Sequence, residues 1–304
     1  MKINRRNFLK ITGIAGGSLL AGREKTAEAK ETKEDFGDKW GCLIDTTVCL
    51  GCRKCEEACN KVNHLPPPDT SFEDYTVFEK QRRPDAKSYT VVNRYFKEPD
   101  APDKKKEPIF VKVQCMHCND PACVSACIVG ALQKLPEGPV AYNASKCIGC
   151  RYCMVACPFV IPAYEYHNPL TPKVRKCIFC HEILEKGGLP GCAQVCPVEA
   201  ITFGKRRDLV HLAHFKIREN PDRYINHVYG EEEVGGTSWM YLASVPFEKL
   251  GFQKLGKLPP PRLTETIQHT VFKGFVSPLA FYALLGGVMW ITRRKKKNDA
   301  GKEE

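Results

Sequence analysis

The sequence lacks the motifs by which the common classes of enzyme are recognised. It has no P-loop, no Gly-x-Gly-x-x-Gly dinucleotide fingerprint and no hydrolase-type nucleophile motif. Long apolar runs are also scarce: 43% of the 304 residues are hydrophobic and 27% are charged. This balance excludes a disordered chain and a protein with many membrane spans, and we identify no catalytic residue.

Positive charge is plentiful, but it is concentrated at the two ends of the chain. The formal net charge is +11, of which residues 1–29 carry +4 and residues 293–304 carry +3, so that only +4 remains for the body between them. A nucleic-acid-binding domain usually gathers basic residues on its working face. The distribution therefore favours targeting and anchoring segments over a nucleic-acid partner.

The N-terminus contains three elements of an export signal in the expected order. Asn4 to Lys10 includes a pair of arginines, Ile11 to Ala21 is apolar, short and rich in glycine, and residues 27–29 (Ala-Glu-Ala) have the small residues of a cleavage site. The segment resembles the twin-arginine (Tat) signals of bacterial cofactor proteins, which implies that the chain crosses a membrane already folded. We expect residues 1–29 to be this signal peptide and residues 30–41 to be a linker.

Cysteine is abundant, and sixteen of the seventeen cysteines form four quartets. Each quartet begins with a C-x2-C pair and ends with a C-x3-C pair, and the first and third share the full spacing C-x2-C-x2-C-x3-C. The second widens the middle gap to four residues, and the fourth holds an 11-residue insertion there. In chain order the quartets are Cys49, Cys52, Cys55 and Cys59; Cys115, Cys118, Cys123 and Cys127; Cys147, Cys150, Cys153 and Cys157; and Cys177, Cys180, Cys192 and Cys196.

Three kinds of site could account for these cysteines. Disulfides suit an exported protein, but a C-x2-C-x2-C run places three thiols too close in sequence to close useful loops. Structural zinc sites use pairs of C-x2-C units that lie far apart. The run C-x2-C-x2-C-x3-C-P is the bacterial ferredoxin pattern, in which the fourth cysteine binds the neighbouring cluster. The spacing therefore favours [4Fe-4S] clusters over zinc, and zinc over disulfides.

The shared ligand predicts that the clusters come in close pairs. When a C-x3-C pair begins a helix, its two cysteines lie one turn apart, with Cβ atoms about 5–6 Å from each other. Two quartets therefore make one two-cluster module, and four quartets make two.

The segments between the quartets predict how the modules are built. Residues 128–146 join quartets two and three and are long enough for a strand, a turn and a second strand at 140–143, so that quartets one and four would pair around them. We also expect strands at 41–45, at 109–113 and shortly after Cys196. The predicted fold class is α+β, with two interleaved ferredoxin-like two-cluster modules in residues 42–206.

The cysteine order resembles that of the four-cluster electron-transfer subunits of membrane oxidoreductases, the family that includes the formate dehydrogenase beta subunit. Because no quartet lacks a cysteine, the resemblance implies four [4Fe-4S] clusters. Proline is absent after Cys59 and Cys127. This absence does not affect ligation, but the conformation of the turns at these two positions is not predicted. Carried over by position, the ligand sets are Cys49, Cys52, Cys55 and Cys196; Cys177, Cys180, Cys192 and Cys59; Cys115, Cys118, Cys123 and Cys157; and Cys147, Cys150, Cys153 and Cys127.

Three features could suggest other chemistry. Residues 177–181 match the C-x-x-C-H sequence of c-type haem attachment, but a haem there would leave the rest of that quartet without a role. Cys42, the odd cysteine, has apolar neighbours, and we expect a buried thiol that binds no metal. His117 lies between two cysteines of a complete quartet, and we expect it to donate a hydrogen bond or simply to pack.

Basic residues stand beside several of the cysteines. Such charges offset the negative charge of a cluster and raise its reduction potential. For each one taken alone, a solvated surface position is the simpler expectation. These residues are Arg53, Lys54, Lys146, Arg151 and Lys176.

Four segments lie outside the cysteine-rich core. Residues 60–108, rich in charge, proline and aromatic side chains, are interpreted as an insertion, with one or two strands near 90–96, that packs on the core or on a partner. Residues 207–273 would form an extension with a helix to about residue 220, a strand at 240–245 and a proline-rich linker. Residues 274–292 carry no charge and as a helix would span about 28 Å, close to the bilayer core of about 30 Å. The basic tail, residues 293–304, favours a cytoplasmic end.

The combination of an export signal, four quartets and an anchor narrows the resemblance to the HybA-type iron-sulfur subunits of the hydrogenase-2 class. It is carried by residues 4–10, 115–127, 150–157, 187–192 and 267–270. The resemblance implies a single-pass, non-catalytic electron-transfer subunit on the periplasmic face of the bacterial cytoplasmic membrane. Electrons would arrive from a [NiFe] hydrogenase small subunit, bound to its large subunit, and leave to an integral membrane subunit that reduces quinone.

Two alternatives remain open from the sequence. One is the beta subunit of another respiratory oxidoreductase, such as formate dehydrogenase. The other is a redox-inert metal or disulfide scaffold. In both the hydrogenase-2 interpretation and the formate dehydrogenase-type alternative, catalysis lies in the partner subunit, because a cluster held by four protein thiolates has no open coordination position for a substrate.

Overall fold

A computed structural model describes residues 39–98, 106–166 and 173–262, together with residues 282, 285–290 and 292. The expected signal peptide and cytoplasmic tail lie outside the described residues, and so does most of the expected membrane helix at 274–292. In the part that is described, no helix combines the length and the apolar composition needed to cross a membrane.

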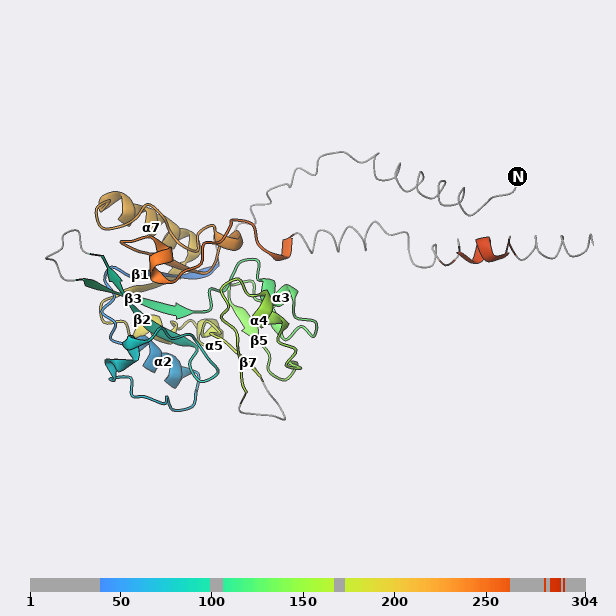
Figure 1. Cartoon of the computed structure of the whole chain (residues 1–304), viewed down its shortest axis with the longest axis horizontal. Helices are drawn as coiled ribbons and strands as arrows, with labels where there is room; N and C mark the ends of the chain where they lie inside the picture. Colours follow the sequence, from blue (N-terminus) through green and yellow to red (C-terminus); the bar gives the residue numbers. More distant parts are fainter. Residues whose placement is uncertain are drawn as a thin grey trace, which may run out of the picture. The chain divides into compact units, whose positions relative to one another are not determined.

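A three-stranded sheet lies next to the longest helix (Figure 1). Strand β1 (Trp40–Asp45) is central: it pairs antiparallel with β8 (Ile201–Lys205) and parallel with β9 (Trp239–Leu242). Helix α7 (Arg206–Glu219) begins directly after β8 and packs on β1. The strands predicted at 41–45, after Cys196 and at 240–245, and the helix predicted to about residue 220, are therefore confirmed, with bounds shifted by a few residues.

Strand β1 is buried on both faces, as its unbroken apolar sequence requires. Successive side chains of a strand point to opposite faces. Cys42 and Ile44 therefore pack in one hydrophobic core, and Leu43 points the other way and packs against Leu209 and Ala213 of α7. Cys42 has no exposed surface and a free thiol, which confirms the prediction of a buried cysteine.

A long antiparallel pair, β2 (Thr90–Lys97) with β3 (Glu107–Gln114), carries the chain into the second quartet. The short 3-10 helix η2 (Tyr75–Glu79) packs on β2, and so does helix α2 (Lys54–Val62), which holds the end of the first quartet (Figure 1). The predicted insertion thus packs on the core.

The remaining elements are short. Two small antiparallel pairs, β4 with β5 and β6 with β7, lie before and after the third quartet in the sequence, and α3 lies beside α4 (Figure 1). The hairpin predicted between quartets two and three is confirmed, and the fold is mixed α+β as predicted. The bounds are β4 Leu132–Lys134, β5 Val140–Tyr142, β6 Ala163–Tyr164, β7 Val174–Arg175, α3 Ala122–Ser125, α4 Tyr152–Ala156, α5 His181–Glu185, α6 Gly191–Gln194, η3 Glu233–Gly235 and η4 Phe247–Leu250.

Candidate metal centres

Two cavities in the structure are each lined by four cysteines from two different quartets. Counted together with adjoining space that is open to solvent, the first measures about 410 Å³ and the second about 310 Å³. We call the first site A and the second site D. Site A consists of Cys49, Cys52, Cys55 and Cys196, and site D of Cys127, Cys147, Cys150 and Cys153.

The other eight cysteines of the quartets form two further groups, sites B and C. Burial raises the pKa of Cys59, and the nearby thiols of Cys177, Cys192 and Cys180 raise it further. Burial likewise raises the pKa of Cys118, and its neighbours Cys115, Cys157 and Cys123 add to the effect. We take site B as Cys59, Cys177, Cys180 and Cys192 and site C as Cys115, Cys118, Cys123 and Cys157, the sets that the family resemblance implies; Cys42 also lies near Cys177, Cys180 and Cys192. The two cavities bring together the sets implied for sites A and D.

All seventeen cysteines are free thiols, so none is committed to a disulfide. Within the described ranges, no three His, Cys, Asp or Glu side chains converge closely enough to hold one metal ion. The sulfurs of sites A and D instead stand around cavities. A cubane cluster suits such an arrangement because each of its four irons binds a different thiolate.

The loops that open the four quartets share one backbone feature. In each C-x2-C pair, the residue before the second cysteine has a positive φ: 70° at Gly51, 50° at His117, 69° at Gly149 and 61° at Phe179. A left-handed residue in a tight loop turns successive N–H groups toward one point and creates a concavity for an anion. In the fourth quartet the Phe179 N–H donates to Cys177 Sγ at 3.4 Å, as a site for thiolates and sulfide requires.

The turns that close the quartets explain why proline is not needed at two of them. The third residue after the last cysteine is left-handed in quartets two, three and four, at Gly130, Val160 and Glu199. After Cys127, which lacks the proline, the turn is kept and the Ala131 N–H donates to Cys127 Sγ at 3.2 Å. After Cys59 there is no such turn, because α2 continues to Val62.

His117 and Phe179 connect the opening loops of sites C and B. Both are buried, and their rings meet edge to face with centroids 5.0 Å apart. The packing predicted for His117 is confirmed, but its polar contact differs from the prediction: the ring accepts at Nδ1 from the Val140 N–H at 2.8 Å. This acceptance places the ring proton on Nε2.

Burial favours the protonated form of several of these thiols. It raises the pKa of Cys49 and Cys153 to about 11 and that of Cys123 and Cys177 to about 12. Buried thiolates need a cation in direct contact, and metal binding displaces the protons. Four thiols around a cavity, with N–H groups aimed at sulfur, therefore fit a [4Fe-4S] cluster. The haem alternative is disfavoured, because Cys177 and Cys180 lie with Cys59 and Cys192 in site B.

The basic residues beside the quartets divide into two kinds. Lys54, Lys146 and Arg151 are exposed, as expected for surface charges, but Arg53 and Lys176 are buried. The Lys176 ammonium donates to the carbonyls of Val140 at 2.6 Å and Cys177 at 3.0 Å.

The sequence interpretation missed two further lysines. Lys134 donates to the Cys118 carbonyl at 2.8 Å, and Lys112 is buried in β3 among cysteines of sites A and B. In the sequence, the only indication that Lys112 is buried is its place as a single charged residue within the apolar run that precedes Cys115.

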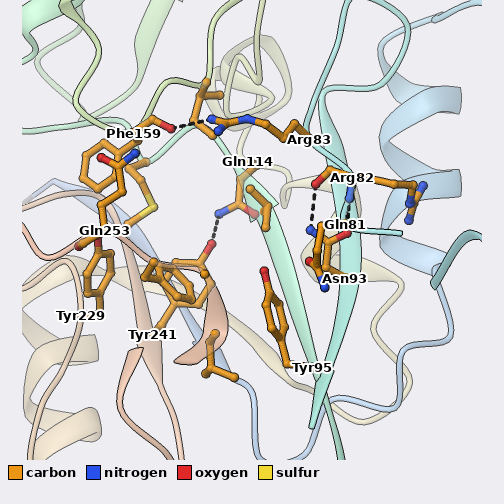
Figure 2. Close-up of a pocket in the computed structure, with 16 residues that line it drawn as sticks. Gln81, Arg82, Arg83, Asn93, Tyr95, Gln114, Phe159, Tyr229, Tyr241 and Gln253 are labelled. Atoms are coloured by element: carbon orange, nitrogen blue, oxygen red, sulfur yellow. Dashed lines mark hydrogen bonds between the residues drawn. The ribbon is translucent and has the colours of Figure 1, made fainter. Parts of the chain in front are cut away.

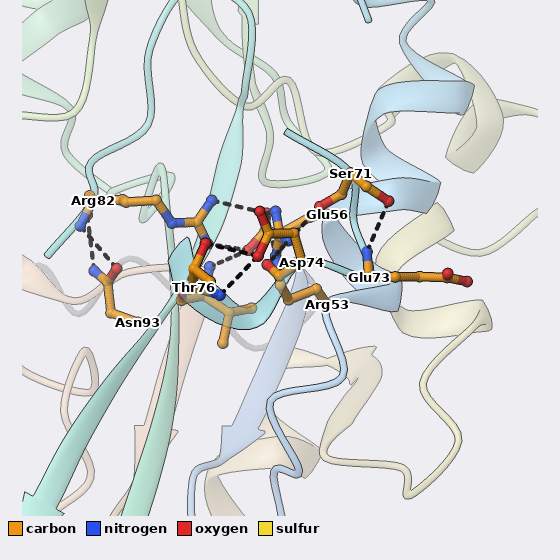
Figure 3. Close-up of polar contacts among 9 residues, drawn as sticks. Arg53, Glu56, Ser71, Glu73, Asp74, Thr76, Arg82 and Asn93 are labelled. Carbon is orange, nitrogen blue, oxygen red and sulfur yellow. Dashed lines mark hydrogen bonds and ion pairs between the residues drawn. The ribbon is translucent and has the colours of Figure 1, made fainter. Parts of the chain in front are cut away.

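A buried carboxylate ties the insertion to site A (Figure 3). Glu56, next to Cys55 on α2, accepts from Arg53 at 3.0 Å and from Arg82 at 2.6 Å, and also from the Val92 N–H of β2 at 2.6 Å. The Arg53 guanidinium reaches on to two backbone carbonyls of the insertion. These hydrogen bonds and ion pairs take the place of the water molecules that would solvate Arg53 at the surface.

A separate cavity lies between the β2–β3 pair and β9 (Figure 2). Arg83 donates across its edge to the Phe159 carbonyl at 3.0 Å, and the Gln114 amide donates to the Tyr241 hydroxyl at 2.7 Å. None of the described residues that line this cavity is a cysteine. It is therefore distinct from the four cysteine sites.

Four cysteine-lined sites on a mixed α+β scaffold define an iron-sulfur protein of the ferredoxin type. Residues 107–206 match the family described as 4Fe-4S dicluster domain. The chain is 36% identical to the hydrogenase-2 operon protein HybA of Escherichia coli O157:H7, over 98% of this chain and 97% of the relative. The chain belongs to the family of HybA-like iron-sulfur electron-transfer subunits.

Two other relatives extend the comparison. The formate dehydrogenase-O iron-sulfur subunit of Escherichia coli (strain K12) is 34% identical, over 81% of this chain and 79% of the relative. A protein of Nitratidesulfovibrio vulgaris is 49% identical, over 97% of this chain and 78% of the relative.

Proposed function

We propose that this chain carries four [4Fe-4S] clusters and relays electrons from a periplasmic [NiFe] hydrogenase small subunit to a membrane subunit that reduces quinone. The observation that carries the proposal is the order of the four sites, which follow one another as A, B, C and D. When bound, each cluster would take up and release one electron at a time.

Contacts between neighbouring sites support this order. Cys55 of site A and Cys59 of site B lie one turn apart on α2. Sites B and C meet in one hydrophobic cluster that contains Cys59, Cys177 and Cys115.

Sites C and D meet in the same way. Cys123 and Cys127 lie one helical turn apart in sequence at α3, and one hydrophobic cluster contains Cys123 of site C and Cys153 of site D. Each site thus touches the next, as a relay requires.

The environment of the sites also suits electron transfer between subunits. Sites B and C lie inside the fold, where apolar side chains such as Ile161 and Tyr89 exclude water. Site D reaches the surface at the exposed Cys150. Exposed apolar residues gather there, and contiguous apolar surface marks a docking face for another protein. They are Ile128, Ile148, Tyr152 and Val155.

The choice of partner rests on the comparison. The HybA relative is matched over nearly its whole length, whereas the formate dehydrogenase subunit is matched over 79% of its length. We therefore propose a hydrogenase partner and keep a formate dehydrogenase-type partner as the second candidate. Co-purification distinguishes them, because the first predicts stoichiometric nickel and the second molybdenum or tungsten.

The proposed location follows from the two ends of the sequence. Residues 1–29 would direct export by the Tat route, and residues 274–292 would anchor the chain with residues 293–304 in the cytoplasm. Protease added to intact spheroplasts should then remove the cysteine-rich domain and spare a C-terminal epitope tag. Protection of the whole chain would contradict this location.

Metal analysis tests the cofactor directly. Anaerobically purified protein should contain about sixteen iron atoms per chain, from four cubane clusters, and should give an EPR signal after dithionite reduction. Stoichiometric zinc without iron, or EPR silence after reduction, would reject the proposal in favour of a redox-inert scaffold.

A further inference from the structure

Lys112 is a buried charge that lies between two of the candidate cluster sites. It occupies β3, which crosses the core, and only 2% of its surface is exposed. It lines the cavity of site A together with all four cysteines of that site. Its ammonium also lies over the ring of Trp239, which shares a hydrophobic cluster with Cys192 of site B. One lysine therefore serves both sites.

The ammonium group is held in place without being neutralised by a carboxylate. Lys112 Nζ donates to Gln114 Oε1 at 2.9 Å and lies 4.5 Å from the centroid of the Trp239 ring. Gln114 is fixed in turn, because its amide donates to the Tyr241 hydroxyl, which donates to the Lys112 carbonyl at 2.8 Å. No carboxylate within the described ranges forms an ion pair with this ammonium.

The buried Arg53 nearby shows the contrast. Its guanidinium pairs with the buried carboxylate of Glu56, which also pairs with Arg82, so the charge of Arg53 has an anionic partner beside site A. Burying an unpaired ammonium is strongly unfavourable unless an anion compensates it. The groups that line the same cavity as Lys112, and that become anionic when they bind a metal, are the cysteines of site A.

We propose that Lys112 is the shared counter-ion of the clusters at sites A and B, and that it raises the reduction potentials of these two clusters. The inference rests on the proposed function, because it needs clusters in both sites. Reduction adds one negative charge to a cluster, and a fixed positive charge in a water-excluded environment stabilises the reduced form. Lys112 thus acts on the two clusters through its positive charge and binds no iron itself.

The test compares Lys112→Met, which removes the charge and keeps the length of the side chain, with Lys112→Arg, which keeps the charge. Lys249→Met is the matched control, since it removes an exposed lysine. Each full-length protein, anaerobically purified, is titrated potentiometrically and followed by EPR, and its iron content is measured.

In Lys112→Met, two of the four reduction steps should move to lower potential. At a fixed potential the ratio of reduced to oxidised cluster should fall about tenfold for these two steps, a shift of about 59 mV for one electron. Lys112→Arg and Lys249→Met should leave all four steps near their native positions. If Lys112→Met instead loses about half of its iron and Lys112→Arg retains it, the requirement for the charge is also supported.

Two results would overturn the inference. One is a Lys112→Met protein with full iron content and four unshifted steps. The other is equal loss of iron in the Met and Arg variants, which would show that the shape of lysine matters and its charge does not. A native protein without iron would instead reject the proposed function, so the two failures are distinguishable.

Discussion

The helix that carries cysteines of both site A and site B, α2, is longer than the helices α3 and α4 of sites C and D, although Cys192 of site B lies on the equally short α6. Helix α2 has nine residues and β2 and β3 have eight each, but α3 and α4 have four and five, and the hairpins around them have strands of two or three residues. The ligand pattern is the same in both halves, so the difference lies in what surrounds the sulfurs.

The halves also differ in their buried ion pairs and in the exposure of one cysteine. Sites A and B enclose Lys112 and the Glu56 ion pairs, and site D exposes Cys150 and a rim of apolar side chains. The four cysteines of site B are all buried and those of site A are half-buried, whereas site D has an exposed cysteine. Site D therefore has the features of a surface that receives a partner.

Removal of a ligand should have the largest effect and should differ between the halves. Cys177→Ser and Cys150→Ser should each lose about four iron atoms, one cluster. Cys177→Ser should also lower the Tm strongly, because Cys177 lies in the hydrophobic cluster shared by sites B and C. Iron analysis and thermal unfolding provide the measurements.

Cys42→Ser is the control for these variants. Cys42 is buried, like Cys177, but is in none of the four ligand sets, so the variant should keep its full iron content. Equal loss of thermal stability in Cys177→Ser and Cys150→Ser would contradict the contrast between the halves.

The Glu56 network should matter next. Glu56→Ala leaves the guanidinium groups of Arg53 and Arg82 without their buried partner, and breaking a buried pair in this way costs about 3–5 kcal/mol. Thermal unfolding at a fixed scan rate should show a clear fall in Tm. Glu57→Ala removes only exposed pairs on the same helix, so its Tm should stay near the native value. Equal Tm values for both variants would refute the role of the network.

Two glycines test the tightness of the loops. Gly51 in site A and Gly130 after site D both have positive φ, where an L-residue costs about 1–2 kcal/mol. A Cβ at Gly51 would also lie 2.3 Å from Phe110 Cδ1, whereas a Cβ at Gly130 meets nothing within 4 Å. Gly51→Ala should therefore lower the Tm more than Gly130→Ala. If Gly130→Ala lowered the Tm more than Gly51→Ala, the loop at site A would not be more tightly packed than the loop after site D.

The smallest effect on the isolated protein is expected at the rim of site D. Val155 is 87% exposed, so Val155→Asp should change neither iron content nor Tm but should reduce the fraction of partner subunit that co-purifies. Leu258→Asp alters another exposed apolar residue, 73% exposed, and should retain the partner. Full retention of the partner by Val155→Asp would exclude this rim as the docking face.

The sequence was sufficient for features that repeat or that depend on neighbours along the chain. The cysteine spacing and its family resemblance predicted which thiols meet, and apolar runs predicted β1, β3 and β9 close to their observed bounds. Sequence reasoning did not predict that β9 pairs parallel with β1, because that pairing depends on how distant segments dock.

The sequence analysis failed mainly to predict which charged residues are buried. Arg53 looked like a surface residue, since the Glu56 and Arg82 contacts that bury it are set by the packing of the insertion on α2. Lys112 gave a faint signal as one charge in an apolar strand. The cysteines that surround it come from segments on both sides of it in the chain, and only the folded structure brings them together.

The exchange of one cysteine between the quartets of each half also orders the assembly of the protein. Every thiol of sites C and D occurs between Cys115 and Cys157, so all their ligands are present once that stretch of polypeptide has been synthesised. Sites A and B draw on Cys49 at one extreme and Cys196 at the other, so their ligand sets are complete only when the ribosome has passed the last quartet. Clusters can therefore be completed in sites A and B only after the whole cysteine-rich region has been translated.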